Sequence, residues 1–214
     1  MKRVILLGSS GSIGESTCKV ARALPDKMKM VGLGVAKSTT RVLEQAKEFG
    51  VRAIAVSDPQ AADQIQKDLP QGTKFFPGAD GLVRMVEETE ADMVLVAIVG
   101  TAGLAPALAA LRTGKDLAVA SKEILVLAGS AVMEEAKKQK RQVLPVDSEH
   151  NAIFQCLQGA DEKGVKKIIL TASGGPFRKS RAAEMEQVTV AQALRHPTWS
   201  MGKKITIDSA TMFN

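Results

Sequence analysis

The stretch Gly8-Ser9-Ser10-Gly11-Ser12-Ile13-Gly14 lies between a short apolar run and the first amphipathic segment of the chain. The apolar run at residues 3–7 is typical of a buried strand, and residues 13–24 carry apolar side chains at helical spacing. Glycines in such a turn let the backbone approach a pyrophosphate, and the next helix offers free N–H donors. The stretch therefore predicts a dinucleotide-binding turn. Its G-x-x-G-x-x-G spacing differs from the commonest fingerprint, and an ordinary tight turn is the alternative.

Outward from this turn, apolar runs alternate with helical patterns as far as residue 146. Strands are predicted at residues 3–7, 29–35, 52–56, 93–99, 116–120 and 142–146, and helices at 13–24, 39–49, from 58 onward, 81–88, 104–112 and 126–140. Such an alternation predicts a parallel sheet that is covered on both faces. We therefore expect an α/β fold, a Rossmann-like doubly wound parallel sheet.

The character of the chain changes at Asp147, where we place a domain boundary. Residues 1–146 are predicted to form the dinucleotide-binding domain, and residues 147–214 part of a second, α+β catalytic domain. In this second part we expect a helix at 151–158, strands at 166–171 and 203–207, and a helix that starts at Asp208-Ser209. Only five residues follow Ser209, so we expect the chain to be a piece of a longer protein.

Composition narrows the function classes. The chain has 214 residues, of which 45% are hydrophobic and 24% charged, as in globular proteins. The net charge is +6, yet there are only six Phe, one Trp and no Tyr, and the basic cluster at 137–141 ends a predicted helix. We therefore expect an anionic small molecule as the partner, and no nucleic acid.

The longest apolar run, residues 93–99, is too short to cross a bilayer, and the N-terminus has no signal-peptide pattern. We therefore expect no membrane partner and a cytoplasmic location. Cys18 and Cys156 are the only cysteines and have no metal-type spacing. Both are predicted to be buried thiols.

The end of the second predicted strand indicates which dinucleotide is bound. NAD sites usually place Asp or Glu there to bind the ribose hydroxyls. The segment Gly34-Val35-Ala36-Lys37-Ser38-Thr39 contains no acid. Lys37 with Ser38 suits a 2′-phosphate, which favours NADP over NAD. The alternative for Lys37 is a solvated surface lysine.

Polar groups follow two further predicted strands. Asp147 and Glu149 come directly after residues 142–146, and Lys122 follows the strand that ends at Ala120. Parallel sheets carry their functional groups at the carboxyl ends of the strands. In an extended turn the two carboxylates can face one point, and they suit Mg²⁺ or Mn²⁺. A helix N-cap with favourable acids is an equally good interpretation of Asp147 and Glu149.

Two later motifs have the residue types of a substrate site. Ser173-Gly174-Gly175-Pro176 follows an apolar run and can form a phosphate nest or a plain turn. His196-Pro197-Thr198-Trp199 holds one of the two histidines and the only tryptophan. A loop of this kind can close over a ligand.

Together these motifs resemble one family, 1-deoxy-D-xylulose 5-phosphate reductoisomerase, over the whole chain. The matching segments are Gly8 to Gly14, Val146 to Ala152, Ala172 to Phe177, His196 to Gly202, and Asp208 to Thr211. The resemblance implies an NADPH-dependent, divalent-metal-assisted enzyme that converts 1-deoxy-D-xylulose 5-phosphate to 2-C-methyl-D-erythritol 4-phosphate in the non-mevalonate isoprenoid pathway. The implied partner is a phosphosugar, and the full-length form is implied to be a homodimer.

The resemblance also implies roles for individual residues. Asp147 and Glu149 would bind Mg²⁺ or Mn²⁺ and, with Lys122 and His196, would form the catalytic set. Substrate-binding residues would be Lys122, Ser148, Ser173, His196, Ser209 and Asn214. NADPH-binding residues would be Ser10, Gly11, Ser12, Ile13, Ala36, Lys37, Ser38, Ser121, Glu123 and Gly202. Trp199 would sit on a mobile flap.

The sequence departs from the family pattern in places. The family usually has Thr at Ser10, Gly-Lys-Asn at Ala36-Lys37-Ser38, and Asn at Ser121. Its motif continues past Asn214 to a glutamate that completes the metal site, and a helical domain follows. We therefore expect this chain alone to be inactive.

Two other functions stay open from the sequence. An NADP-binding piece without turnover is the first alternative. A semialdehyde-type dehydrogenase is the second, and it would need a nucleophilic cysteine with a partner histidine at the carboxyl edge. Cys18 and Cys156 both fall in predicted helices, which disfavours the second alternative.

Overall fold

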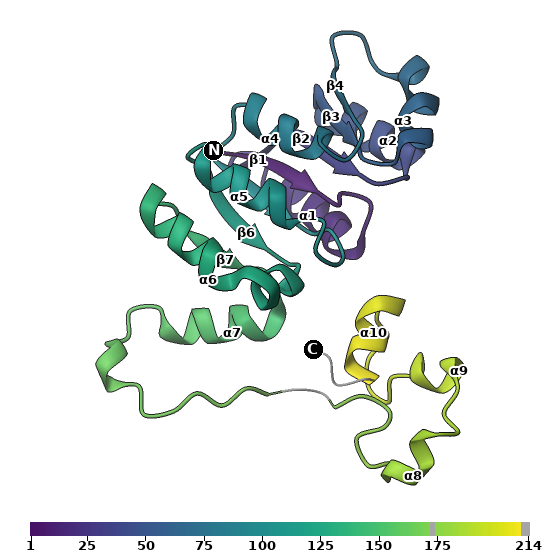
Figure 1. Cartoon of the computed structure of the whole chain (residues 1–214), viewed down its shortest axis with the longest axis vertical. Coiled ribbons are helices and arrows are strands. Elements are labelled where there is room, and N and C mark those ends of the chain that lie inside the picture. The colour runs from purple at the N-terminus through teal and green to yellow at the C-terminus, as the bar shows by residue number, and fades with distance from the viewer. Residues whose placement is uncertain (172–173, 211–214) are drawn as a thin grey trace. The chain divides into compact units, whose positions relative to one another are not determined.

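The computed structural model describes residues 1–171 and 174–210 (Figure 1). Internal packing divides the chain into two compact units, residues 1–151 and residues 152–214. The division falls inside helix α7 (Ser148–Leu157), a few residues after the boundary that the sequence suggests.

The first unit is built on one parallel sheet. Its strands are β1 (Lys2–Leu7), β2 (Met28–Val35), β3 (Ala53–Val56), β4 (Lys74–Pro77), β5 (Met93–Val96), β6 (Asp116–Val119) and β7 (Val143–Pro145). They lie in the order β4-β3-β2-β1-β5-β6-β7, and each neighbouring pair is parallel. The chain builds outward from β1 to β4 and then returns to place β5 beside β1. This reversal makes the carboxyl ends of β1 and β5 the switch point where open α/β sheets bind ligands.

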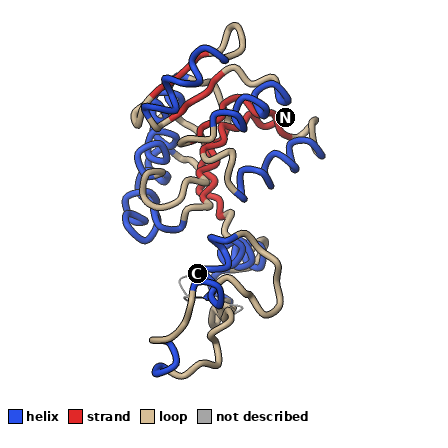
Figure 2. The backbone as a smooth tube through the Cα atoms, turned by 90° about the vertical axis from the view of Figure 1, so that its right-hand side faces the viewer, coloured by secondary structure: helices blue, strands red, loops and turns tan. Residues whose placement is uncertain are grey.

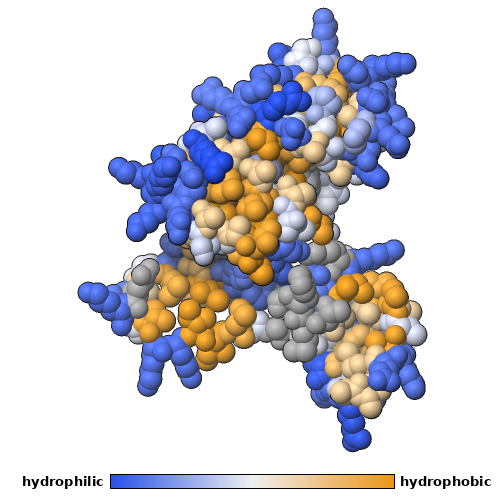
Figure 3. All heavy atoms as spheres, in the orientation of Figure 1, coloured by the Kyte–Doolittle hydropathy of each residue, from blue (hydrophilic) through white to orange (hydrophobic). Residues whose placement is uncertain are grey.

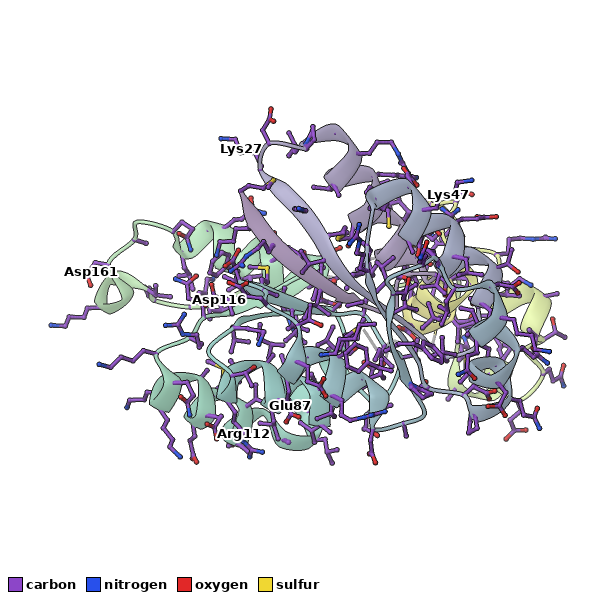
Figure 4. The ribbon with its side chains drawn as sticks, turned by 90° about the horizontal axis from the view of Figure 1, so that it is seen from above. Lys27, Lys47, Glu87, Arg112, Asp116 and Asp161 are labelled. Carbon is purple, nitrogen blue, oxygen red and sulfur yellow. The ribbon has the colours of Figure 1, made fainter. Side chains whose placement is uncertain are left out.

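Helices cover both faces of this sheet (Figure 2). One layer contains α1 (Ser12–Ala23), α2 (Thr39–Phe49) and α3 (Pro59–Ile65), which continues into the 3₁₀ turn η1 (Gln66–Asp68). The other contains α4 (Gly81–Glu88), α5 (Leu104–Arg112) and α6 (Lys122–Gln139). Figure 4 shows Lys47 of α2 and Glu87 of α4 on opposite sides of the sheet.

Alternation along the strands fills two separate cores. In β1, Val4 and Leu6 pack with the α1–α3 layer, whereas Ile5 and Leu7 pack with the α4–α6 layer. All four side chains are buried because both faces of a parallel sheet are covered. The predicted doubly wound fold is therefore confirmed.

Several predicted boundaries in the first unit were wrong. Strand β4 was not among the predicted strands, although Phe75 and Phe76 lie between turn glycines and pair with β3. Strand β5 ends at Val96, not Val99. Helix α6 begins at Lys122 and α7 at Ser148, each several residues earlier than predicted.

The second unit has no strand in its described residues, and the two predicted strands there are wrong. It contains the end of α7, the 3₁₀ turn η2 (Glu162–Gly164), α8 (Ala182–Met185), α9 (Val190–Ala193) and α10 (Lys203–Ala210). Residues 165–171 have the apolar composition of a strand but no regular structure. Ile168, Ile169 and Leu170 are 61%, 69% and 60% exposed. A strand needs backbone partners, and none of the described residues provides them.

The predicted strand at residues 203–207 is helical, and the predicted helix start at Asp208-Ser209 lies at the end of that helix, α10. Thr206 illustrates how a helix holds this predicted strand sequence. Its amide and its hydroxyl both donate to the Gly202 carbonyl at 3.0 Å. The Thr206 hydroxyl is thereby satisfied within the helix, so the β-branched run Ile205 to Ile207 is accommodated in α10 although its composition is typical of a strand.

Surface properties complete the description. Cys18 is buried but Cys156 is exposed, so predicted burial is wrong for Cys156. Apolar side chains are exposed on α6, where Val126 is 88% and Leu127 62% exposed (Figure 3). Across the described residues, no helix has the length and apolarity that a membrane span requires.

Candidate active site

The glycine turn after β1 has a shape that side chains would prevent. Gly8 has a φ angle of +89°, and a Cβ atom there would lie 2.4 Å from the carbonyl oxygen of Ala97. A Cβ atom on Gly14 would lie 2.3 Å from the carbonyl oxygens of Gly8 and Ser9. Glycine is therefore required at both positions, at Gly8 for the turn and at Gly14 for close packing of α1 on β1.

Some amides of this turn are free within the described part of the chain, whereas those of Gly8, Ser9 and Gly11 donate to backbone carbonyls. Gly11 is the extended residue before α1, with φ −81° and ψ 173°, and no side chain caps the helix. The amides of Ser10, Ser12 and Ile13 donate no hydrogen bond to any described residue. Gly11 and Ser12 are exposed. Free amides at a helix N-terminus, at the switch point of the sheet, are suited to bind a phosphate.

The end of β2 presents the three residues that the sequence suggested for a 2′-phosphate. Ala36, Lys37 and Ser38 are all exposed. The Lys37 Nζ lies 3.4 Å from a carboxylate oxygen of Asp58, which begins the next helix along the sheet edge. The Ala61 amide donates to Asp58 and, together with Lys37, lowers the pKa of this carboxyl against the opposing effect of burial. Asp58 therefore balances part of the positive charge of Lys37.

Lys122 and Asp147 meet at the carboxyl edge of the sheet, after β6 and β7. The Lys122 Nζ donates to Asp147 Oδ2 at 3.3 Å, and the two side chains are only 12% and 14% exposed. Burial by itself raises the pKa of Asp147, but the charge of Lys122 and its hydrogen bond outweigh this, and the net pKa is lowered. Asp147 is therefore a carboxylate at neutral pH.

Asp147 and Glu149 lie around the start of α7, not in the extended turn that we expected. The Asp147 carbonyl accepts the Asn151 amide at 2.8 Å, so Asp147 is also the residue before the first helical turn, and Glu149 lies within that turn. Glu149 is among the groups that act on the Asp147 carboxyl, so the two side chains are within reach of each other. The Asn151 Nδ2 donates to the Pro145 carbonyl at 2.8 Å and ties this turn to β7.

Two adjacent carboxylates are the donor chemistry of Mg²⁺ or Mn²⁺, which take oxygen ligands and keep several waters. Asp147 and Glu149 fit such an ion as a partial ligand set. Within residues 1–171 and 174–210, no group of three or more His, Cys, Asp or Glu is close enough to hold a metal.

Ser121 and Glu123 flank Lys122 but differ in surroundings. Ser121 is 5% exposed, and its hydroxyl donates to the Ile98 carbonyl in the loop after β5. This bond joins the loops after β5 and β6. Glu123 lies in the first turn of α6 and is half-buried.

The second unit contains the remaining predicted site residues. His196 Nδ1 accepts the amides of Trp199 at 2.9 Å and Thr198 at 3.2 Å, so the proton of a neutral His196 ring lies on Nε2. Trp199 is 59% exposed. A Cβ atom on Gly175 would lie 2.4 Å from the Ser209 carbonyl oxygen. The Gly174-Gly175 turn therefore packs directly on the end of α10.

The structure brings some predicted residues together in the first unit, and others belong to the second unit. Lys122, Asp147 and Glu149 form one cluster in the first unit, with Ser148 exposed beside it. His196, Gly202 and Ser209 belong to the second unit. Ser173 and Asn214 lie outside the described residues.

Sequence reasoning missed Gln45, which contacts the phosphate turn. Gln45 is fully buried on α2, and its Nε2 donates to the Ser9 carbonyl at 3.0 Å. The sequence feature that could have identified Gln45 is its position as a polar residue on the apolar face of the helix, beside Val42 and Ala46.

Cys18 is not a nucleophile of the kind that the semialdehyde-type alternative needs. Burial raises the pKa of Cys18 to about 11, so its thiol stays protonated at neutral pH. Cys156 is exposed on α7.

A doubly wound parallel sheet with a glycine turn after its first strand defines the first unit as a Rossmann-like α/β domain. Comparison with known proteins is more specific. The family model for 1-deoxy-D-xylulose 5-phosphate reductoisomerase matches residues 4–129, and that for the C-terminal domain of the same enzyme matches residues 143–214. The chain belongs to the 1-deoxy-D-xylulose 5-phosphate reductoisomerase family.

Individual relatives agree with this assignment. The chain is 46% identical over 214 residues to the 1-deoxy-D-xylulose 5-phosphate reductoisomerase of Thermodesulfovibrio yellowstonii and 47% identical to that of Thermoanaerobacter sp.. Each alignment covers 100% of this chain and 56% of the relative, so the chain spans little more than half the length of these relatives.

Solved structures of the same family also match the whole chain and span about twice its length. A DOX-P reductoisomerase in complex with NADPH, fosmidomycin and magnesium has a TM-score of 0.90 and 40% identity, covering 100% of this chain and 55% of that one. The Zymomonas mobilis enzyme in complex with NADPH has a TM-score of 0.87 and 39% identity, covering 99% and 54%.

Proposed function

We propose that this chain supplies the NADPH site and part of the metal and substrate site of a 1-deoxy-D-xylulose 5-phosphate reductoisomerase. The reaction would convert 1-deoxy-D-xylulose 5-phosphate to 2-C-methyl-D-erythritol 4-phosphate. The observation that carries the proposal is the glycine turn at Gly8–Gly14, whose free amides lie at the switch point of the sheet. NADPH and magnesium in the solved relatives support it.

In this proposal the phosphate turn binds the pyrophosphate of NADPH through the amides of Ser10, Ser12 and Ile13. Gly11 has no side chain to block that approach, and the exposed residues Lys37 and Ser38 contact the 2′-phosphate. Lys37 remains close to Asp58, so we expect a moderate preference for NADPH over NADH.

Asp147 and Glu149 would hold the divalent ion, and Lys122 would keep the Asp147 carboxylate ionised and oriented. When bound, the metal acts as a Lewis acid toward the substrate oxygens and NADPH supplies the hydride. The low exposure of Lys122 and Asp147 excludes water from their contact and strengthens it.

The remaining roles rest on the family resemblance. We propose that Ser148, His196 and Ser209 bind the phosphosugar, that Ser121, Glu123 and Gly202 line the NADPH site, and that Trp199 belongs to a flap. Ser121 would act through its backbone, because its hydroxyl already donates to Ile98. Some expectations stay predictions. These are the roles of Ser173 and Asn214, the homodimeric full-length form and the cytoplasmic location.

Titration with NADPH, followed by nicotinamide fluorescence, tests the cofactor site. We expect binding to the 214-residue chain, and weaker binding to Gly11→Val, whose side chain would project over the amides. Gly164→Val is the control, because Gly164 is also exposed and lies outside the proposed cofactor residues, has no positive φ angle, and has no atom within 4 Å of its Cβ position. Absence of NADPH binding by the folded, unmodified chain would refute the proposed function.

Substrate-dependent NADPH oxidation distinguishes the enzyme from the alternative of a binding piece without turnover. The chain and a full-length relative are assayed side by side with 1-deoxy-D-xylulose 5-phosphate and Mn²⁺. NADPH binding without oxidation by this chain, beside turnover by the full-length relative, is the expected result, because the chain is proposed to supply only part of the metal and substrate site. Oxidation that is lost in Asp147→Asn would favour a site that is complete in this chain.

A further inference from the structure

Gln45 occupies a position where a glutamine lowers the stability of the fold. It is 0% exposed in the core between α2 and the sheet, and its Oε1 has no hydrogen-bond partner among the described residues. A buried, unsatisfied polar atom lowers stability relative to an apolar side chain of similar size. Fold stability alone therefore gives little reason for a glutamine at this position, and its two donated hydrogen bonds need another explanation.

Those two hydrogen bonds join the phosphate turn to a charged pair. The Gln45 Nε2 donates to the Ser9 carbonyl at 3.0 Å and to Glu15 Oε1 at 3.1 Å. Glu15 is held in turn by Arg41, whose Nε and Nη2 donate at 2.6 and 2.8 Å. The hydrogen bonds from Arg41 lower the pKa of Glu15, so Glu15 is ionised and only accepts.

An acceptor on each side fixes the orientation of the Gln45 amide. Its NH₂ group must face both Ser9 and Glu15, because reversing the amide would place Oε1 against two acceptor oxygens. The Ser9 carbonyl is therefore held toward the protein interior. In a trans peptide the C=O and the following N–H point in opposite directions, so the Ser10 amide is turned outward. This agrees with the Ser10 amide, which donates to no described residue.

We propose that Gln45 is a positioning residue of the phosphate turn: it holds the Ser9–Ser10 peptide so that the Ser10 amide points at the bound pyrophosphate. This inference rests on the proposed NADPH site. Gln45 itself does not touch the ligand. It acts on a single peptide, and its loss leaves the 2′-phosphate end at Lys37 and Ser38 in place.

The test compares Gln45→Met, which keeps the side-chain length but removes the donors, with Thr17→Val as the matched control. Thr17 is 7% exposed on α1, and its hydroxyl donates to the Ile13 carbonyl at 2.8 Å, so this variant also loses one buried hydrogen bond. For each protein we measure the dissociation constants of NADPH and of 2′-AMP, which lacks the pyrophosphate.

We expect Gln45→Met to weaken NADPH binding about tenfold and to leave 2′-AMP binding within about twofold, whereas Thr17→Val changes neither. Unchanged NADPH affinity, or an equal loss for both ligands, would overturn the positioning role while the proposed function stands. Failure of the unmodified chain to bind NADPH would overturn both.

Gln45→Glu provides a second, independent readout if Gln45→Met does not fold. An ionised glutamate has no proton to donate to Ser9, whereas a protonated one has a single O–H donor. NADPH affinity of Gln45→Glu should therefore rise relative to the unmodified chain as the pH is lowered from 8 to 5. A constant ratio of the two affinities across this range would contradict the inference.

Discussion

At the residue scale, the phosphate turn requires glycine for two separate physical reasons. Gly8 has a positive φ angle, which strains the backbone of any other residue. In addition, backbone atoms of Ala97 occupy the space that a Gly8 side chain would need. Gly50, at the end of α2, also has a positive φ angle of +64°, but nothing lies within 4 Å of its Cβ position. Substitution at Gly50 therefore measures backbone strain alone, whereas substitution at Gly8 measures backbone strain plus the steric clash.

We predict that Gly8→Ala destabilises the chain by at least about 3 kcal/mol, because strain and clash add. Gly50→Ala should cost only about 1 kcal/mol, from the backbone alone. Urea unfolding followed by circular dichroism measures both. Similar losses in the two variants would show that the Ala97 contact relaxes without cost.

Charge at the end of β2 supports a second prediction at this scale. Asp58→Asn retains a side chain that can accept from the Ala61 amide but removes the negative charge beside Lys37. NADPH should therefore bind severalfold more tightly to this variant, with NADH affinity unchanged. Lys37→Met should have the opposite effect on NADPH alone. Isothermal titration with both nucleotides checks this, and parallel changes for NADPH and NADH would argue against a 2′-phosphate at Lys37.

At the scale of elements, ion pairs join the starts of β1, β5 and β6, which lie in this order in the sheet. Arg3 of β1 donates through Nη2 to Asp92 Oδ1 at 2.8 Å, and the Arg3 amide donates to Asp92 Oδ2 at 2.7 Å, just before β5. Asp116, labelled in Figure 4, begins β6, accepts from Lys2 at 3.1 Å, and also accepts the Gln142 amide before β7 at 3.2 Å. The amino edge of the sheet is thus held by pairs that cross between strands distant in sequence.

The Arg3–Asp92 contact makes a pH-dependent prediction. The side-chain hydrogen bond from Arg3 is the main cause that lowers the pKa of Asp92 from 3.8 to about 2. Its stabilising effect is complete above about pH 4 and is lost as the pH falls through about 2. Asp92→Asn should therefore lower the free energy of unfolding at pH 7, and the difference from the unmodified chain should shrink between pH 4 and pH 2.

Glu90→Gln is the control for this pair. Glu90 also contacts Arg3, at 2.6 Å, but its side chain is 86% exposed, so solvent screens the interaction. Urea unfolding at several pH values should show a smaller and less pH-dependent change in Glu90→Gln. An Asp92→Asn difference that does not vary with pH would exclude the proposed linkage.

At the scale of the whole molecule, the two units differ in how well they are packed. The first unit has two buried clusters, one on each face of a hydrogen-bonded sheet. Residues 159–171 of the second unit are exposed wherever their exposure is described, and no strand pairing protects their amides. Local opening is easiest where few apolar contacts and few buried hydrogen bonds exist.

Amide hydrogen exchange should therefore separate the units. We predict strong protection in β1, β2, β5 and β6, and exchange close to that of an unfolded chain at residues 159–171. Mass spectrometry of peptides after timed labelling measures this. Protection of residues 159–171 comparable to that of β1 would mean that this segment pairs with a partner in solution.

The sequence alone determined the fold class and the position of the phosphate turn. Apolar runs of the right length, separated by helical periods, leave a parallel sheet as the only way to bury both strand faces. The glycines at 8 and 14 could be placed because their roles depend on neighbours in the same βα unit. The Lys122–Asp147 cluster could be anticipated because both residues directly follow parallel strands.

Only the tertiary structure decided the contacts that join distant segments. Gln45 contacts Ser9, and Asp58 contacts Lys37, and each contact joins two neighbouring βα units. Whether such contacts form depends on the length and direction of the side chains, which sequence spacing does not give. Residues 166–171 and 203–207 share an apolar, β-branched composition, yet neither forms a strand. A strand exists only when another segment completes its backbone hydrogen bonds, and local composition cannot supply that partner.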